Sequence, residues 1–244
     1  MTTTDQSPHD VRFDWGMSGL LALRDCRTFV IVDVLSFSTC VSVVVDQGAS
    51  VLPFRFNDVD AAQSFALGHD AVLAAHRGAQ GRYSLSPTSL LGIPPQTKLV
   101  LPSPNGSTLA IAAAAMGSVL AGCFRNCTAV AELASARGAP IAVIAAGEQW
   151  QDGSLRPCFE DLCGAGAIIA RIRGTRSPEA SIASAAFSRA EAELQALLCD
   201  SASGRELIAR GFEGDVRLAA ALDVSSFAPE LSRHAFTRPR NDAA

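Results

Sequence analysis

Runs of β-branched and aliphatic residues recur along the chain and predict a series of buried strands. Between them lie stretches whose spacing and composition favour helix. The predicted strands cover residues 29–34, 51–54, 71–74, 98–101, 118–121 and 141–145. Two of the predicted helices cover residues 58–68 and 126–137, and a third runs from the turn at 102–108 to residue 116. Two more begin at residue 36 and near residue 159, and most of residues 178–222 is expected to be helical. Residues 77–96 and 149–158 are expected to form loops.

This alternation of strand and helix predicts an α/β fold with a layered sheet, parallel strand pairs, helices on both faces and additional C-terminal helices. We expect a single α/β domain over residues 11–231. We expect residues 1–10 and 232–244 to be loose termini.

Composition narrows the class of protein. Of the 244 residues, 48% are hydrophobic and 18% charged, which is typical of a well-buried domain. The net charge of −4 argues against a nucleic-acid partner. The seven cysteines include no C-x-x-C pair and there are only four histidines, so a zinc site is not expected and the thiols fit a reducing compartment.

No apolar stretch is long enough to span a membrane, and the polar N-terminal residues lack the apolar core of a secretion signal. We therefore expect a cytoplasmic protein with no membrane partner. A homo-oligomer is compatible with the sequence.

Polar residues follow four of the predicted strands. They are Asp33, the turn 103–108, residues 123–126, and Gly147-Glu148 with Glu160-Asp161 shortly after. In open α/β sheets, ligands bind outside the carboxyl ends of the strands. The sequence therefore predicts one site where these segments meet.

Asp33 interrupts a Val/Ile strand, where an unpaired charge would be costly. A metal or a cationic group of the substrate would offset that cost. The alternative is a carboxylate that caps the helix beginning at residue 36.

The turn from Ser103 to Thr108 contains Asn105-Gly106, which tolerates positive φ, and Ser107, which can cap the next helix. A helix N-terminus of this kind can bind phosphate. An ordinary strand-to-helix turn is the other interpretation.

Glu160 and Asp161 begin a helix that continues with small residues, which would let it lie close to the sheet. Acidic residues in a first turn favour the helix dipole. With Asp33, they also make the hard oxygen set that Mg²⁺ prefers.

Three further polar residues follow strands. Arg77 can bind a phosphate or carboxylate, or be a solvated loop residue. Asn126 is better explained as a helix cap, and His76 as a structural histidine. A haloacid-dehalogenase-type site is excluded because Asp33 is followed by Val34-Leu35, and no Gly-x-Ser-x-Gly elbow follows a strand.

Five segments in order resemble motifs of the 2-phosphosulfolactate phosphatases, the phosphatases of coenzyme M biosynthesis. The segments are Asp33-Val34-Leu35 with Ser38-Thr39, Asn105-Gly106-Ser107, Gly122 to Asn126, Ala146-Gly147, and Glu160 to Gly166. They are similar to the family's Asp-Val-Leu-Arg-Ala-Ser-Thr-Thr, Thr-Asn-Gly-Thr, Gly-Ser-Phe-Leu-Asn, Cys-Ala-Gly and Glu-Asp-x-x-Cys-Ala-Gly-Ala.

The resemblance implies a layered α/β fold and Mg²⁺-dependent hydrolysis of the phosphate ester of a 2-hydroxy acid. With the residue-level analysis, it makes Asp33, Glu160 and Asp161 the expected catalytic and metal-binding residues. The expected substrate-binding residues are Ser38, Thr39, Arg77, Asn105, Gly106, Ser107, Asn126 and Gly147.

Three positions depart from the family pattern. Ser36-Phe37 replaces Arg-Ala, and His76-Arg77 replaces Glu-Arg. The loop 81–87 lacks the family's Asp and Asn. We expect a phosphatase acting on a small phosphorylated hydroxy acid; the alternative is a catalytically impaired anion-binding protein on the same scaffold.

Overall fold

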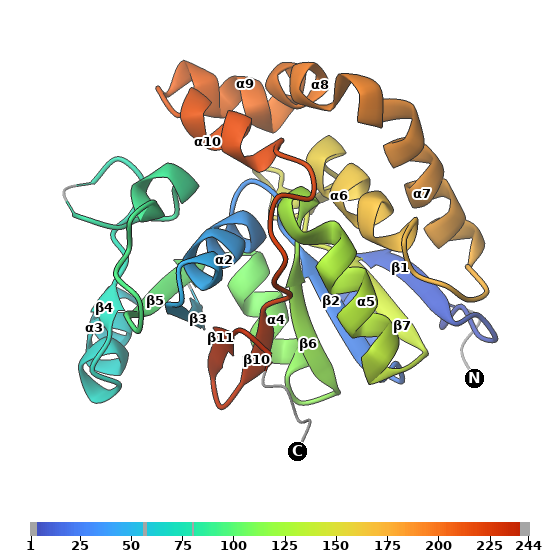
Figure 1. Cartoon of the computed structure of the whole chain (residues 1–244), viewed down its shortest axis with the longest axis horizontal. Coiled ribbons are helices and arrows are strands. Elements are labelled where there is room, and N and C mark those ends of the chain that lie inside the picture. Colours follow the sequence, from blue (N-terminus) through green and yellow to red (C-terminus); the bar gives the residue numbers. More distant parts are fainter. Residues whose placement is uncertain (1–3, 56–57, 80, 240–244) are drawn as a thin grey trace.

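A computed structural model describes residues 4–55, 58–79 and 81–239 of the chain. Within these residues one nine-stranded, mostly parallel sheet carries helices on both faces (Figure 1), which confirms the predicted layered α/β class. Its strand order is β1-β7-β2-β6-β10-β11-β3-β5-β4. The strands are β1 (Val11–Trp15), β2 (Thr28–Val32), β3 (Ser50–Arg55), β4 (Val72–Leu73), β5 (Lys98–Ser103), β6 (Ser118–Gly122), β7 (Ile141–Ala145), β10 (Glu230–Ser232) and β11 (Ala235–Thr237).

Apart from α1, the helices fall close to the predicted positions. They are α1 (Gly16–Ala22), α2 (Phe37–Asp46), α3 (Val59–Gly68), α4 (Gly106–Ala113), α5 (Cys127–Arg137), α6 (Phe159–Ile169), α7 (Pro178–Ala190), α8 (Leu194–Asp200), α9 (Ala202–Ala209) and α10 (Glu213–Ala219). Inside the two predicted loops lie a 3-10 turn (Pro87–Leu90) and a small hairpin of β8 (Glu148–Gln149) and β9 (Leu155–Arg156). None of the described helices has the length and apolar character needed to cross a membrane.

The central strand β2 is buried over its full length because both of its faces are covered. Phe29 and Ile31 point into a core shared with α1, α2 and α4. Val30 and Val32 point into a second core shared with α5, α6 and α7. A strand between two helical layers reads as a continuous apolar run, which is the pattern that identified it in the sequence.

The sheet consists of two parallel groups joined by a C-terminal hairpin. Strands β1, β7, β2 and β6 are mutually parallel, as are β3, β5 and β4. The hairpin β10–β11 connects them through antiparallel pairings on both of its sides. Because three antiparallel pairings separate the two groups, their strands run in opposite directions. Adjacent strands in a sheet rotate by about 20–25°, and with this twist Asp33 after β2 and Gly106 after β5 lie within hydrogen-bond distance.

The predicted loose termini need correction where the structure describes them. Residues 235–237 form β11, because Phe236 is fully buried against the core. Near the N-terminus, the Gln6 side chain bonds the backbone of Phe13, and Asp10 bonds Thr175, so residues 6–10 are held in place. Residues 1–3 and 240–244 lie outside the described residues. The sequence also failed to predict β1 and α1.

Replacing Phe236 with Ala should destabilise the protein by about 3–5 kcal/mol, the range for large-to-small changes in a core. The Phe236 ring is fully buried and packs edge-on against Phe37, with ring centroids 6.0 Å apart. Urea unfolding followed by circular dichroism measures the change. Leu67→Ala, at a side chain 73% exposed, is the control and should change stability by less than about 0.5 kcal/mol. Equal effects of the two changes would contradict a structural role for the hairpin.

Candidate active site

Asp33 lies in the loop between β2 and α2 and is only 7% exposed. Its Oδ1 accepts the N–H of Phe37 at 3.1 Å, and its Oδ2 accepts the N–H of Gly106 at 2.9 Å. Burial raises the pKa of Asp33, the two N–H groups and Arg77 lower it, and Glu160 raises it further. The expected helix-capping role is therefore present, and the carboxylate also ties α4 to α2.

Gly106 begins α4 at a point of close approach. A Cβ there would lie 2.4 Å from Cδ1 of Phe37 and 2.6 Å from Oδ2 of Asp33, closer than real contacts allow. Because the Gly106 N–H already donates a hydrogen bond to Asp33, it is not available to bind an anion. A phosphate at this turn would have to use the later amides of the first helical turn, which lack partners within the helix.

Asp161 joins three elements at the carboxyl end of the sheet. Its Oδ1 accepts the N–H of Val34 and its Oδ2 the N–H of Gly147, both at 2.8 Å. Asp161 is 4% exposed; burial, with Asp33 and Glu160 acting in the same direction, raises its pKa well above the usual value. The carboxylate thus fixes the ends of β2 and β7 against α6.

The small residues of α6 allow this close contact, as the sequence predicted. A Cβ on Gly164 would lie 2.7 Å from Cγ2 of Val34. Because α6 sits directly against the sheet, the acidic residues at its start are held at the strand ends.

Glu160 and Glu148 complete a group of four carboxylates. Glu160 is 3% exposed, and its side chain makes no hydrogen bond or ion pair within the described part of the chain. Glu148 accepts a hydrogen bond from Nδ2 of Asn105 at 3.0 Å. Burial, followed by the nearby Asp33 charge, raises the pKa of Glu148 to about 7. The sequence placed Glu148 at a strand end without singling it out; its position next to Gly147 was the available signal.

Four residues expected to bind substrate are buried beneath the site. Their side-chain oxygens or amides bond the backbone of neighbouring strand ends. Ser38 bonds Ile31 and Asp33, Thr39 bonds Val34, Ser107 bonds Leu101, and Asn126 bonds Cys123 and Ala121. All four residues have no exposed surface. We therefore assign them a positioning role in place of direct substrate contact. Asn126 stands at the start of α5, but its side chain bonds none of the α5 amides.

Arg77 is held on several sides and is not a solvated loop residue. Its Nη2 donates to Oγ of Ser36 at 2.6 Å and to the carbonyl of Leu85. Its guanidinium lies 5.4 Å from the centroid of the Phe212 ring, and the side chain is 13% exposed. Within the described residues its Nη1 makes no hydrogen bond, so this nitrogen can receive an anionic group.

Asp215 brings the C-terminal helices to the site, which the sequence did not predict. It lies in α10, has no exposed surface, and accepts hydrogen bonds at Oδ1 from Ser86 and Thr88. Its Oδ2 lies 3.7 Å from Nε of Arg77, and neither atom has another hydrogen-bond partner. Asp215 is one of three charged residues in the seven-residue helix α10, and nothing in that local sequence distinguishes it from a surface residue.

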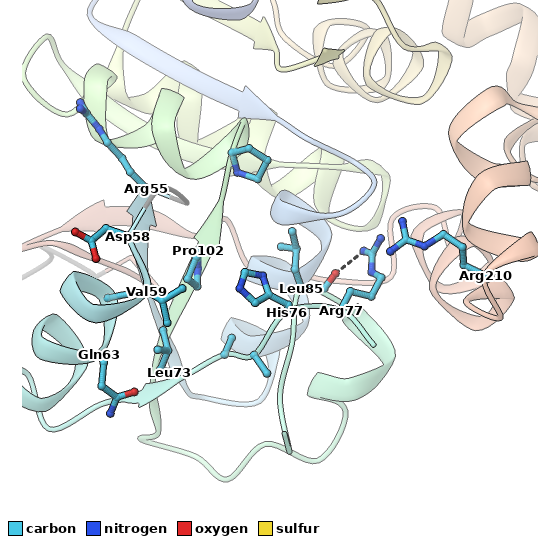
Figure 2. Close-up of a pocket in the computed structure, with 14 residues that line it drawn as sticks. Arg55, Asp58, Val59, Gln63, Leu73, His76, Arg77, Leu85, Pro102 and Arg210 are labelled. Atoms are coloured by element: carbon cyan, nitrogen blue, oxygen red, sulfur yellow. Dashed lines mark hydrogen bonds between the residues drawn. The ribbon is translucent and has the colours of Figure 1, made fainter. Parts of the chain in front are cut away.

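Two pockets share Pro104; the smaller includes Glu148 in its lining, and the larger includes Arg77. The larger, about 510 Å³, carries Arg55, Arg77 and Arg210 in its lining, with Asp58 as the only acid (Figure 2). The smaller, about 270 Å³, has Glu148 as the only charged residue in its lining. An anionic molecule therefore finds favourable charge on the Arg77 side and repulsion on the Glu148 side.

Hard oxygen donors make the site chemically suited to Mg²⁺. Within the described residues, no three His, Cys, Asp or Glu side chains are already gathered closely enough to hold a metal ion. Mg²⁺ commonly uses only one or two carboxylates and completes its shell with water and phosphate oxygens. The unpartnered Glu160 and the neighbouring Asp33 fit such a partial set.

In the presence of a chelator, the free energy of unfolding should fall as pH rises from about 5 to about 8, by roughly 1–3 kcal/mol. Glu148, Asp33 and Asp161 have raised pKa values, so the folded chain holds protons that the unfolded chain has released. That stabilisation is lost as pH passes through the folded-state pKa values. Mg²⁺ supplies the missing positive charge, so it should raise the melting temperature more at the higher pH.

Thermal unfolding at both pH values, with Mg²⁺ or EDTA, measures this effect. Glu160→Gln should reduce the Mg²⁺-dependent shift, whereas Glu132→Gln, at an exposed position in α5, should preserve it. A shift that is independent of pH and unchanged by Glu160→Gln would argue against a cation at these carboxylates.

Comparison with known proteins places this site in a family. A search of curated protein sequences finds no match to the chain. A family model described as 2-phosphosulpholactate phosphatase matches residues 20–234 of the 244. The matched range includes all four carboxylates, Arg77 and Asp215. On this match over most of its length, the chain belongs to the 2-phosphosulpholactate phosphatase family.

Proposed function

We propose that this chain is a Mg²⁺-dependent phosphatase that hydrolyses the phosphate ester of a small 2-hydroxy acid resembling 2-phosphosulfolactate, releasing sulfolactate or a similar acid and inorganic phosphate. The observation that carries the proposal is the group of four carboxylates around the ends of β2 and β7, next to Arg77. Burial raises the pKa values of Asp33, Glu148 and Asp161, and the neighbouring carboxylates raise them further, so a bound cation would favour the ionised forms of this group.

Asp33 and Glu160 are the proposed metal ligands. These two carboxylates would hold Mg²⁺, which would supply positive charge to offset the charge that develops in the transition state. Asp161 accepts a backbone N–H group at each oxygen, from Val34 and Gly147, and so ties the ends of β2 and β7 to α6; we assign it the role of holding these strand ends in place.

Glu148 is the proposed proton carrier. A group with a pKa near neutrality is suited to general acid–base catalysis, and Asn105 orients its carboxylate. In the reaction, the oxygen of water forms a bond to phosphorus while the bond to the alcohol oxygen breaks. Glu148 accepts a proton from the water and then gives it to the departing alkoxide, so that the products are the alcohol and inorganic phosphate.

Arg77 is the proposed ligand of the acid group of the substrate. Its Nη1 is available, and Ser36, Leu85 and Asp215 fix the rest of the guanidinium. A role in coenzyme M biosynthesis and a cytoplasmic location belong to the same proposal; the first rests on the family resemblance, and the second on the polar N-terminal residues and the short apolar stretches of the sequence.

The second candidate is a catalytically impaired protein that binds the same anions. Ser36 stands where the family motif has Arg, and Arg77 makes a hydrogen bond with it. The site therefore has one cation fewer than the motif provides. Such a protein would be stabilised by a phosphorylated acid without turning it over.

A panel of phosphorylated 2-hydroxy acids, assayed for phosphate release with and without Mg²⁺, distinguishes the two candidates. We expect Mg²⁺-dependent release, and Asp33→Asn should lower kcat/KM by roughly 100-fold or more, because it removes charge at the reacting group. Asp25→Asn, at an exposed position, is the matched control. Ligand-induced thermal stabilisation without any release would favour the binding protein instead.

Asp215→Asn should raise KM several-fold with a smaller effect on kcat. The amide can still accept the hydrogen bonds of residues 86–88, but the charge facing Arg77 is lost. Arg77→Gln and the double variant complete a thermodynamic cycle, and residues that act together should give non-additive losses. Additive losses would indicate that Asp215 supports only the fold.

A further inference from the structure

The larger pocket is bigger than a lactate-sized acid requires. Its volume of about 510 Å³ falls within the range of roughly 300–1,000 Å³ for pockets that enclose drug-sized ligands. The ester of a three-carbon acid would leave most of this space to water.

The lining of this pocket is apolar in its middle. Val59 and Ala62 of α3, Leu73 of β4, and Leu85, Pro102 and Pro104 from the adjoining segments contribute to it. Val59 is 61% exposed, so part of this apolar lining faces solvent. Figure 2 shows Val59, Leu73 and Pro102 between Arg55 on one side and Arg77 on the other.

Charges lie on both sides of this apolar stretch. Arg77 adjoins Asp33 and therefore the proposed phosphate position. Arg55, the last residue of β3, is exposed and has no hydrogen bond or ion pair within the described residues. The one acid in the lining, Asp58, is committed to the N–H of Ala61 at the start of α3. Arg210, further along on the Arg77 side, pairs with Glu206 at 3.1 Å. Arg55 is thus the cation left to bind a second acidic group.

We propose that this pocket holds the alcohol part of the substrate, and that this part is an extended 2-hydroxy acid with an aliphatic middle and a second carboxylate at its far end, bound by Arg55. The inference rests on the proposed phosphatase function and specifies its substrate class. The smaller pocket cannot take this role, because Glu148 would repel a terminal carboxylate.

Four phosphate esters separate the contributions of length and charge. They are the 2-phosphate esters of lactate, sulfolactate, 2-hydroxyhexanoate and 2-hydroxyadipate. The adipate ester should have a kcat/KM at least tenfold above those of the lactate and sulfolactate esters, with the hexanoate ester between them. An adipate ester no better than the lactate ester would overturn the proposal, while hydrolysis of the short esters would leave the phosphatase function standing.

Arg55→Gln tests the far carboxylate. The loss of a charge-assisted hydrogen bond should lower kcat/KM on the adipate ester at least tenfold more than on the hexanoate ester. Arg55→Lys keeps the charge and should recover part of the loss. Arg173→Gln, at an exposed position outside both pockets, is the control and should leave the ranking of esters unchanged. Equal losses of Arg55→Gln on all esters would overturn the assignment.

If no ester is hydrolysed, the proposed phosphatase function fails. Calorimetric binding of the same four esters then tests separately whether the pocket prefers an extended acid with a second carboxylate. The adipate ester should then bind at least tenfold more tightly than the lactate ester, and Arg55→Gln should remove the difference. Equal dissociation constants would overturn the pocket proposal as well.

Discussion

The site depends on buried carboxylates that each accept two backbone N–H groups from different segments. Asp33 joins the start of α2 to the start of α4, and Asp161 joins the ends of β2 and β7 to α6. Burying a carboxylate is unfavourable unless hydrogen bonds or opposite charges compensate. The N–H groups compensate in part, and they do so only when these elements lie in one arrangement. The same contacts that fix the geometry of the site therefore link the layers of the fold at the point where they meet.

Charge is distributed unevenly around this point. Glu148 lies on one side with its pKa raised to about 7, and Arg77 lies on the other, held by Ser36 and Asp215. Under the proposed function, this distribution would orient an organic phosphate before any specific contact forms, with its acid group towards the arginines. Because α10 supplies Asp215, the C-terminal helices take part in this orientation in addition to covering the sheet.

The sequence predicted the fold class and the segments of the site, because both depend on local patterns. The Val/Ile run before Asp33 and the small residues after Asp161 are visible without a structure. The roles of individual side chains were less predictable: Ser38, Thr39, Ser107 and Asn126 are polar residues in the expected segments, yet their side chains point to buried backbone groups. Whether a hydroxyl faces a pocket or the strand beneath it depends on tertiary packing. Asp215 and the β10–β11 hairpin depend on contacts between residues far apart in the chain, which no local pattern encodes.

The hairpin of residues 230–237 also bears on how the protein is made. Every other strand of the sheet precedes it in the chain, so it is the last to leave the ribosome. Until then β6 and β3 have no strand between them, and the two parallel groups are linked only by the helices that pack on strands of both, α2 and α4. Asp33 follows β2 of one group, and Gly106 follows β5 of the other. The hydrogen bond between them is therefore supported by a continuous sheet only after synthesis has passed residue 237. During translation, the nascent chain would carry two partly folded sheets with exposed edges, a state in which chaperone binding is favoured.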